Sequence, residues 1–254
     1  MATRAGFIWD IDGVVIDSPH EESWRLTLTK EPWNADGLSS DLYFTHVASR
    51  PRYEGAHNIL EGMGIYERLG ATTEEAKREL LESYATEKDA LIKDLIERGE
   101  FKLFTDAVSL LLRARRTGVL QAAASASKNA SRMLKRVPRS RVVRELGDDF
   151  DVLAEGDTLY SVFDVDACGM DVGGKVEILK YAADKLQALS EDRIETFVVF
   201  EDAPSGLEAA TSLGYRAVGA LRIGDRSALE EAGAHIVTED LRTIGIEDLL
   251  QMAG

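Results

Sequence analysis

Short apolar runs alternate with longer stretches of helical spacing over most of the chain. The apolar runs are GFIW (6–9), GVLQAAA (118–124), TFVVF (196–200), YRAVGA (215–220) and AHIV (234–237). Each run is followed by a polar or glycine-containing turn. Runs that are apolar at every position are typical of strands buried on both faces and joined by helices. The pattern therefore predicts an α/β fold with a Rossmann-like parallel sheet.

The strand pattern is absent between Asp17 and about Gly99. This stretch shows only helical spacing, as in SYATEKDALIKDLIERG (83–99), whose last glycine suits a helix C-cap. We therefore expect an α/β core domain formed by residues 1–17 and 100–254, interrupted by an all-helical domain at 18–99. The junctions should be short hinges, and the inserted domain should move as a lid.

Composition narrows the choice of partner and compartment. The chain has 254 residues, a formal net charge of -15 and few basic clusters, which argues against nucleic acid or an anionic membrane as a partner. A single cysteine, Cys168, excludes an internal disulfide framework. The N-terminus lacks the apolar core of a signal peptide, and no apolar run approaches the roughly 18 residues that span a bilayer. We expect a soluble, cytoplasmic protein that acts on a small molecule.

Polar residues follow three of the predicted strands. Asp10 and Asp12 follow the first run, Ser125 follows the run at 118–124, and Glu201 with Asp202 follows the run at 196–200. Ligands of parallel α/β sheets bind at the carboxyl ends of the strands. Carboxylates gathered there would repel one another unless a hard cation neutralised them, and oxygen ligands on several loops suit magnesium. The sequence predicts a Mg²⁺ site.

These residues lie in four motifs that resemble those of the haloacid dehalogenase superfamily. The motifs are DIDGVVIDS (10–18), the serine of SASKN (125–129), Lys175 in GGKVEIL, and FEDAPSG (200–206). A lone DxD pair is more often part of a solvated turn than of a site. Here the preceding strand and the EDAPSG segment support a functional site. ASASKN and the helical insert after the first motif are most similar to the β-phosphoglucomutase-like subfamily, whose α-helical domain is called the cap.

The resemblance implies catalytic roles for residues of the core. Asp10 would attack phosphorus and form an aspartyl phosphate, and Asp12 would serve as general acid and base. An acid at the position of Asp12 marks the phosphoryl-transfer branch of the superfamily. The Ser125 hydroxyl and Lys175 would stabilise the transferring phosphoryl group.

The metal would lie between Asp10, the main-chain carbonyl of Asp12 and Asp202, next to Glu201. Covalent catalysis by Asp10 splits a difficult displacement into two steps, and a positioned carboxyl such as Asp12 contributes about 10² to 10⁴ in rate.

Three cap residues resemble substrate-binding residues of the subfamily. Lys88 shares a helical face with apolar residues, so it either snorkels or points into the cleft. Arg50, in HVASRPRYEG, resembles a cap arginine that grips the distal phosphate, although a surface arginine near a helix start is the alternative. His20 resembles a hinge histidine or merely packs.

Ser127, Lys128 and Asn129 complete the SASKN string and are also expected to contact substrate. The alternative role of Lys128 and Asn129 is that of ordinary capping and first-turn residues of a helix that begins there.

Two segments depart from the subfamily pattern. Lys175 is followed by VEIL, where the third motif usually has prolines, so the local backbone must differ. The segment YSVFDVDACGMDVG (160–173) looks inserted, and Asp164 and Asp166 form a second DxD within it. We interpret this insertion as an exposed acidic loop or hairpin that could alter substrate choice or oligomerisation.

The favoured function is a Mg²⁺-dependent phosphotransferase that acts on a sugar phosphate. The alternative is a sugar-phosphate phosphatase that uses the same aspartate, and a non-catalytic sugar-phosphate sensor is disfavoured because Asp10 and Asp12 are both present. The sequence leaves open the sugar, its anomer, the choice between mutase and phosphatase, and whether the protein is a monomer or a small homo-oligomer.

Overall fold

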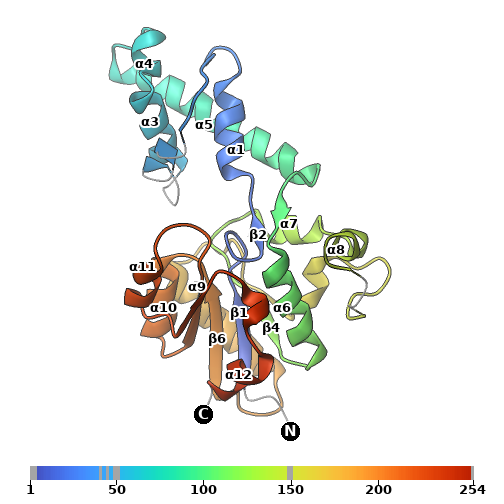
Figure 1. Ribbon diagram of the computed structural model, residues 1–254. Helices are drawn as coiled ribbons and strands as arrows, with labels where there is room; N and C mark the ends of the chain where they lie inside the picture. The colour runs from blue at the N-terminus through green and yellow to red at the C-terminus, as the bar shows by residue number, and fades with distance from the viewer. Residues whose placement is uncertain (1–4, 40–41, 44–45, 48–51, 148–150, 253–254) are drawn as a thin grey trace. The chain divides into compact units, whose positions relative to one another are not determined.

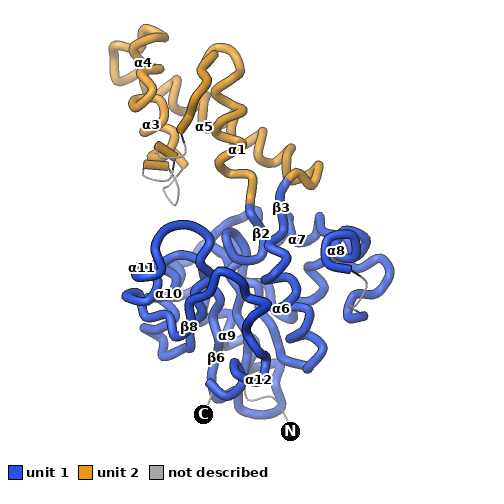
Figure 2. The backbone as a smooth tube through the Cα atoms, viewed as in Figure 1, with its two compact units in different colours: residues 1–17, 101–254 blue, residues 18–100 orange. Residues whose placement is uncertain are grey.

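The protein forms two compact units. The computed structural model describes residues 5–39, 42–43, 46–47, 52–147 and 151–252. Residues 1–17 and 101–254 make up one unit, here the core unit, and residues 18–100 make up the other, the helical unit (Figure 2).

A six-stranded parallel sheet lies at the centre of the core unit (Figure 1). Its order is β5-β4-β1-β6-β7-β8, and every pairing is parallel. The strands are β1 (Ala5–Trp9), β4 (Gln121–Ala123), β5 (Val165–Asp166), β6 (Thr196–Glu201), β7 (Arg216–Ala220) and β8 (Ile236–Thr238). Five of them coincide with the apolar runs, so the predicted α/β fold and its parallel sheet are confirmed.

Helices flank the sheet and bury its side chains. They are α6 (Thr105–Arg116), α7 (Ala130–Lys135), α8 (Arg139–Leu146), α9 (Lys175–Leu189), α10 (Pro204–Ser212), α11 (Arg226–Glu231) and α12 (Ile246–Gln251), with 3-10 turns η1 (Leu159–Val162) and η2 (Leu241–Thr243). α9 packs on β1 and β4, and α10 packs on β6 and β7. Ile8 and Val199 of the sheet join Leu186 and Leu207 of these helices in one buried apolar cluster, which holds the strand ends in place.

A short antiparallel ribbon pairs the two chain segments that lead toward the helical unit. β2 (Ile16–Asp17) pairs with β3 (Lys102–Leu103), and Ile16 lies opposite Leu103. The amide of Phe104 also donates to the carbonyl of Val15 at 3.1 Å. Both segments are thus anchored within the core unit.

The helical unit has its own apolar core. Among the described residues of this unit, the helices with given bounds are α1 (His20–Leu28), α3 (Arg52–Gly62), α4 (Ile65–Arg68) and α5 (Glu74–Glu97). Trp24, Trp33 and Tyr84 are buried and in ring contact with one another through Tyr84. α5 ends as its sequence predicts, because Gly99 has a φ of 71° and its amide donates to the carbonyl of Ile96.

The insertion at 160–173 adds a strand to the sheet, so its interpretation as an exposed loop or hairpin was wrong. β5 is the edge strand and pairs in parallel with β4, with Val165 and Ala167 buried. Asp164 accepts hydrogen bonds from Arg115 at 2.7 Å and from the amide of Gln121 at 2.8 Å. Asp164, the first acid of the second DxD pair, therefore accepts hydrogen bonds from residues of the core unit.

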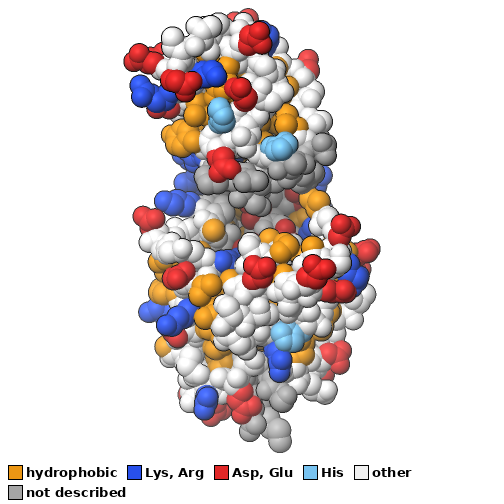
Figure 3. Space-filling model, turned by 90° about the vertical axis from the view of Figure 1, so that its left-hand side faces the viewer, with side chains coloured by type: hydrophobic (Ala, Val, Ile, Leu, Met, Phe, Trp, Pro, Cys, Tyr) orange, Lys and Arg blue, Asp and Glu red, His pale blue; other side chains and the backbone are white. Residues whose placement is uncertain are grey.

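Charged side chains of both signs are interspersed with apolar ones on the face shown in Figure 3. Among the described helices, none combines the length and low polarity that crossing a bilayer requires.

Candidate functional site

The carboxyl ends of β1, β4 and β6 place three of the predicted site residues side by side in the sheet. Asp10 follows the last residue of β1, Ser125 lies just beyond β4, and Glu201 ends β6. The amide of Asp10 donates to the carbonyl of Phe200 at 2.9 Å, and the amide of Ala124 donates to the carbonyl of Trp9 at 2.8 Å. The parallel ladder thus continues up to the site and holds its backbone rigidly.

Lys175, the first residue of α9, links two of the acids. Its Nζ lies 2.6 Å from Oδ1 of Asp10 and 2.7 Å from Oε2 of Glu201. The same ammonium donates to the carbonyl of Ala124 at 3.2 Å. Burial disfavours its charge, but Asp10 and Glu201 outweigh that effect and raise the pKa of Lys175 above its ordinary value.

Three carboxylates converge beside this ammonium. One oxygen each of Asp10, Glu201 and Asp202 lie within 4.8 Å of one another. Burial, together with the charges of Glu201 and Asp12, raises the pKa of Asp10 to about 7 even though Lys175 opposes the shift. Burial and the neighbouring acids raise the pKa of Asp202 well above its ordinary value. Three acids against one lysine leave an excess of negative charge, so a hard divalent cation with oxygen ligands fits this donor set.

Two glycines allow the acids to pack this closely. A Cβ on Gly13, whose φ is 93°, would lie 2.2 Å from Oδ2 of Asp202, and a Cβ on Gly206 would lie 2.2 Å from Oε2 of Glu201. Any other residue at either position would displace a carboxylate.

Asp12 lies in a tight loop that follows β1. The amide of Gly13 donates to the carbonyl of Ile16 at 2.9 Å, and the amide of Ile16 donates to the carbonyl of Ile11 at 2.8 Å. The described carboxylate cluster is formed by Asp10, Glu201 and Asp202. The expected metal contact of Asp12 is its main-chain carbonyl, and this contact remains a prediction.

Two serine hydroxyls of the SASKN segment accept hydrogen bonds from amides of the same segment. Ser125 is buried, and its Oγ accepts from the amide of Ser127 at 3.3 Å. The Oγ of Ser127 accepts from the amide of Asn129, also at 3.3 Å. Asn129 precedes α7 but makes no side-chain capping bond, and Lys128 is exposed. The Ser127 hydroxyl thus closes a local turn before α7, and the side chain of Asn129 does not cap the helix.

The second acid of the insertion supports this segment. Asp166 accepts hydrogen bonds from the Ser131 hydroxyl at 2.9 and 2.8 Å and from the amide of Cys168 at 3.0 Å. Next along the chain, the amide of Gly169 donates to the carbonyl of Ser125 at 2.8 Å. The SASKN segment is therefore held at both ends, through Ser125 and through the first turn of α7. The sequence pattern does not reveal this contribution, because Asp166 is exposed as expected and its role depends on partners that an isolated loop or hairpin would not provide.

In the helical unit, the structure brings His20 and Lys88 together. Lys88 is 4% exposed, its Nζ lies 2.9 Å from Nδ1 of His20, and it sits 4.7 Å from the centre of the Trp24 ring. A lysine with so little exposure is not snorkelling into solvent. Arg50 lies outside the described residues. Contact of these three residues with a substrate remains a prediction.

Sequence analysis also missed Asp106 and Arg222. Arg222 donates to the carbonyl of Val14, two residues after Asp12, at 3.0 Å. Neither residue belongs to a motif, so only their contacts reveal them.

Comparisons with known proteins agree with this arrangement. The family model described as haloacid dehalogenase-like hydrolase matches residues 5–214. The chain is similar to an archaeal β-phosphoglucomutase from the hyperthermophilic Pyrococcus sp. strain ST 04, with 33% sequence identity, a TM-score of 0.77, and coverage of 98% of this chain and 100% of that chain. No curated protein matches.

More distant solved structures share the fold. A β-phosphoglucomutase from Clostridium difficile is 23% identical, with a TM-score of 0.60 and coverage of 98% of this chain and 96% of that one. CbbY from Rhodobacter sphaeroides, solved in complex with phosphate, is 18% identical, with a TM-score of 0.56 and coverage of 96% of each chain.

Proposed function

Because the chain belongs to the haloacid dehalogenase-like hydrolase family, we propose that it is a Mg²⁺-dependent phosphotransferase that moves a phosphoryl group of a sugar phosphate through Asp10. The observation that carries the proposal is the contact of Lys175 with both Asp10 and Glu201 at the strand ends. Membership of the family makes the protein a phosphotransferase or phosphatase. The 33% identity to a β-phosphoglucomutase favours a sugar phosphate as the substrate.

In the first step, a carboxylate oxygen of Asp10 attacks phosphorus, and the bond from phosphorus to the sugar oxygen breaks. Asp12 gives its proton to the departing sugar oxygen, so the products are an aspartyl phosphate, the free hydroxyl and the carboxylate of Asp12. In the second step, Asp12 takes a proton from the accepting hydroxyl, whose oxygen attacks the aspartyl phosphate and releases Asp10.

The surrounding groups hold the phosphoryl oxygens and fix the nucleophile. Lys175 contacts Oδ1 of Asp10 and thereby orients the carboxylate. The hydroxyl of Ser125 and the ammonium of Lys175 offer a donor and a positive charge to the phosphoryl oxygens. Asp10 and Asp202, with Glu201 beside them, would hold Mg²⁺, which supplies neutralisation of the phosphoryl charge.

The acceptor decides between the two candidate activities. A second sugar hydroxyl as acceptor makes the enzyme a mutase, and water makes it a phosphatase; the hydrolase description of the family favours this second candidate. A mutase must exclude water while its bisphosphate intermediate turns over. The helical unit, acting as a cap, would provide that exclusion.

Phosphorus NMR of the protein with Mg²⁺ and a panel of hexose phosphates tests the proposal. The panel includes β-glucose 1-phosphate primed with the 1,6-bisphosphate, and we expect conversion to a 6-phosphate without accumulation of inorganic phosphate. Release of inorganic phosphate alone identifies the phosphatase.

Asp10→Asn, whose amide cannot form an acyl phosphate, should abolish both reactions while the protein stays folded. Comparable turnover in carefully purified Asp10→Asn protein would refute the scheme.

A further inference from the structure

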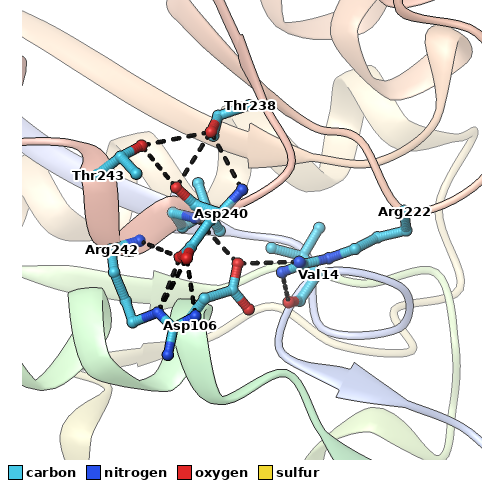
Figure 4. A network of polar contacts seen from close by, with 8 residues as sticks. Val14, Asp106, Arg222, Thr238, Asp240, Arg242 and Thr243 are labelled. Carbon is cyan, nitrogen blue, oxygen red and sulfur yellow. Dashed lines mark hydrogen bonds and ion pairs between the residues drawn. The ribbon is translucent and has the colours of Figure 1, made fainter.

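Arg222 and Asp106 form a buried ion pair beside the loop that carries Asp12 (Figure 4). Nη1 of Arg222 lies 2.9 Å from Oδ2 of Asp106, and the two side chains are 9% and 10% exposed. The same Oδ2 accepts from the amide of Leu241 at 2.9 Å. Asp106 lies in the first turn of α6, Arg222 follows β7, and Leu241 begins η2. Three segments far apart in the sequence therefore meet at one carboxylate.

The second terminal nitrogen of the Arg222 guanidinium contacts the loop that carries Asp12. Nη2 donates to the carbonyl of Val14 at 3.0 Å, and the guanidinium carbon lies 4.1 Å from the centre of the Phe104 ring. The amide of Phe104 donates to the next carbonyl, that of Val15. Two successive carbonyls are thus held by residues outside the loop. Because Val14 is two residues from Asp12, a shift of its carbonyl moves the carboxyl of Asp12.

Stability alone does not explain this pair. Replacing a buried ion pair by well-packed apolar residues is often neutral or stabilising, since both charges must be removed from water. In addition, Nε of Arg222 is buried without a hydrogen-bond partner among the described residues, which carries a free-energy cost. Apolar side chains, however, could not donate a hydrogen bond to the carbonyl of Val14.

We infer that the Asp106–Arg222 pair positions Asp12 for proton transfer to and from the sugar oxygen. This inference rests on the proposed function, in which Asp12 is the general acid and base. Proton transfer requires donor and acceptor within hydrogen-bond reach, so it is sensitive to small shifts of the loop. Asp10 is held independently of Arg222, because its amide donates to the carbonyl of Phe200 in β6 and its carboxylate accepts from Lys175 of α9.

The test compares two leaving groups in wild type and in Arg222→Lys. Lysine keeps a positive charge near Asp106 but lacks the fork that joins Asp106 to the carbonyl of Val14. With β-glucose 1-phosphate, whose leaving oxygen needs a proton, kcat should fall about 10- to 100-fold while KM changes little. With 4-nitrophenyl phosphate, whose phenolate leaves without a proton, the measured rate is that of the first nitrophenolate burst, which reports formation of the aspartyl phosphate alone and should change less than about threefold.

Arg242→Lys is the matched control. Arg242 belongs to the same network but pairs with Asp240, and its side chain is 59% exposed. This variant should leave both rates unchanged. In an Asp12→Asn background, Arg222→Lys should cause no further loss, because the two changes act on one proton transfer.

An equal loss on both substrates, or a further loss in the Asp12→Asn background, overturns the inference and leaves the proposed function intact. Wild type that forms no aspartyl phosphate with either substrate refutes the proposed function and the inference with it. If Arg222→Lys does not fold, Asp106→Asn takes its place with the same expected selectivity. Failure of both variants to fold assigns the pair to folding and overturns its positioning role.

Discussion

Nζ of Lys88 lies 2.9 Å from Nδ1 of His20 inside the helical unit. An ammonium group has only donors, so Nδ1 must be the unprotonated acceptor of this pair. Burial, followed by the charges of Lys88 and Arg52, lowers the pKa of His20 to about 3. The imidazole is therefore neutral around pH 7.

This contact makes the stability of the helical unit depend on pH. The folded pKa of His20 lies below the unfolded value of about 6.5, so its contribution to stability is present above pH 6.5 and is lost as the pH falls toward 3. His20→Gln removes this titration. Between pH 7 and pH 5, we expect wild type to lose about 2 kcal/mol more unfolding free energy than His20→Gln.

Urea unfolding followed by tryptophan fluorescence measures the difference, since Trp24 and Trp33 lie in the core of the helical unit. His57→Gln is the control, because His57 is exposed in the same unit. A wild-type pH dependence equal to that of His20→Gln would contradict the assignment.

Asp202→Ala should weaken Mg²⁺ binding sharply, by about tenfold or more, because it removes one of three converging carboxylates. Calorimetric titration of the protein with Mg²⁺ in the absence of substrate measures the affinity directly. Glu208→Ala changes an exposed acid on the adjacent helix α10 and should leave the affinity as in wild type. An unchanged titration of Asp202→Ala would place the cation elsewhere.

Asp166→Asn should raise KM for the sugar phosphate several-fold and lower the unfolding free energy by roughly 1–3 kcal/mol. Burial opposes the charge of Asp166, but hydrogen bonds from Cys168, Ser131 and Tyr160 hold its pKa below the ordinary value. The amide keeps the shape of the side chain but weakens those bonds, which hold the first turn of α7 and the amide of Cys168, next to the Gly169 amide that donates to Ser125.

The matched variant is Asp164→Asn, in the same DxD pair. Asp164 bonds to Arg115 and to the amide of Gln121, away from the SASKN segment. Its loss should reduce stability without raising KM. Equal KM values for the two variants would show that Asp166 acts on stability alone.

Arg50→Ala should separate mutase from phosphatase activity. A mutase must hold the bisphosphate intermediate at both phosphates, so loss of a cap cation should reduce isomerisation by about 10²-fold or more. Slow hydrolysis of the aspartyl phosphate uses only residues of the core and should persist. Lys88→Ala should show the same pattern more weakly, since an ammonium lacks the bidentate fork.

Isomerisation and phosphate release measured side by side decide the outcome. Wild type that releases phosphate at a healthy rate, shows no isomerisation and is indifferent to Arg50→Ala would establish the phosphatase.

Local sequence is sufficient to predict the sheet and the acidic residues at its edge. Five apolar runs predict five strands because a strand buried on both faces must be apolar at successive positions. Asp10, Ser125 and Glu201 could be grouped in advance because parallel strands present their carboxyl ends at one edge. The approach of Lys175 to Asp10 follows from a motif and from the start of α9.

Other features depend on partners distant in the chain. β5 has two residues with an aspartate at its end, too few for any periodicity, and it becomes a strand because β4 offers it a pairing edge. Arg222 and Asp106 are separated by 116 positions, and neither lies in a recognisable pattern. An ion pair of this kind exists only once the loop after β7 and the start of α6 have been brought together by the sheet. Long-range contacts of single side chains follow from packing, which the order of residues along the chain does not display.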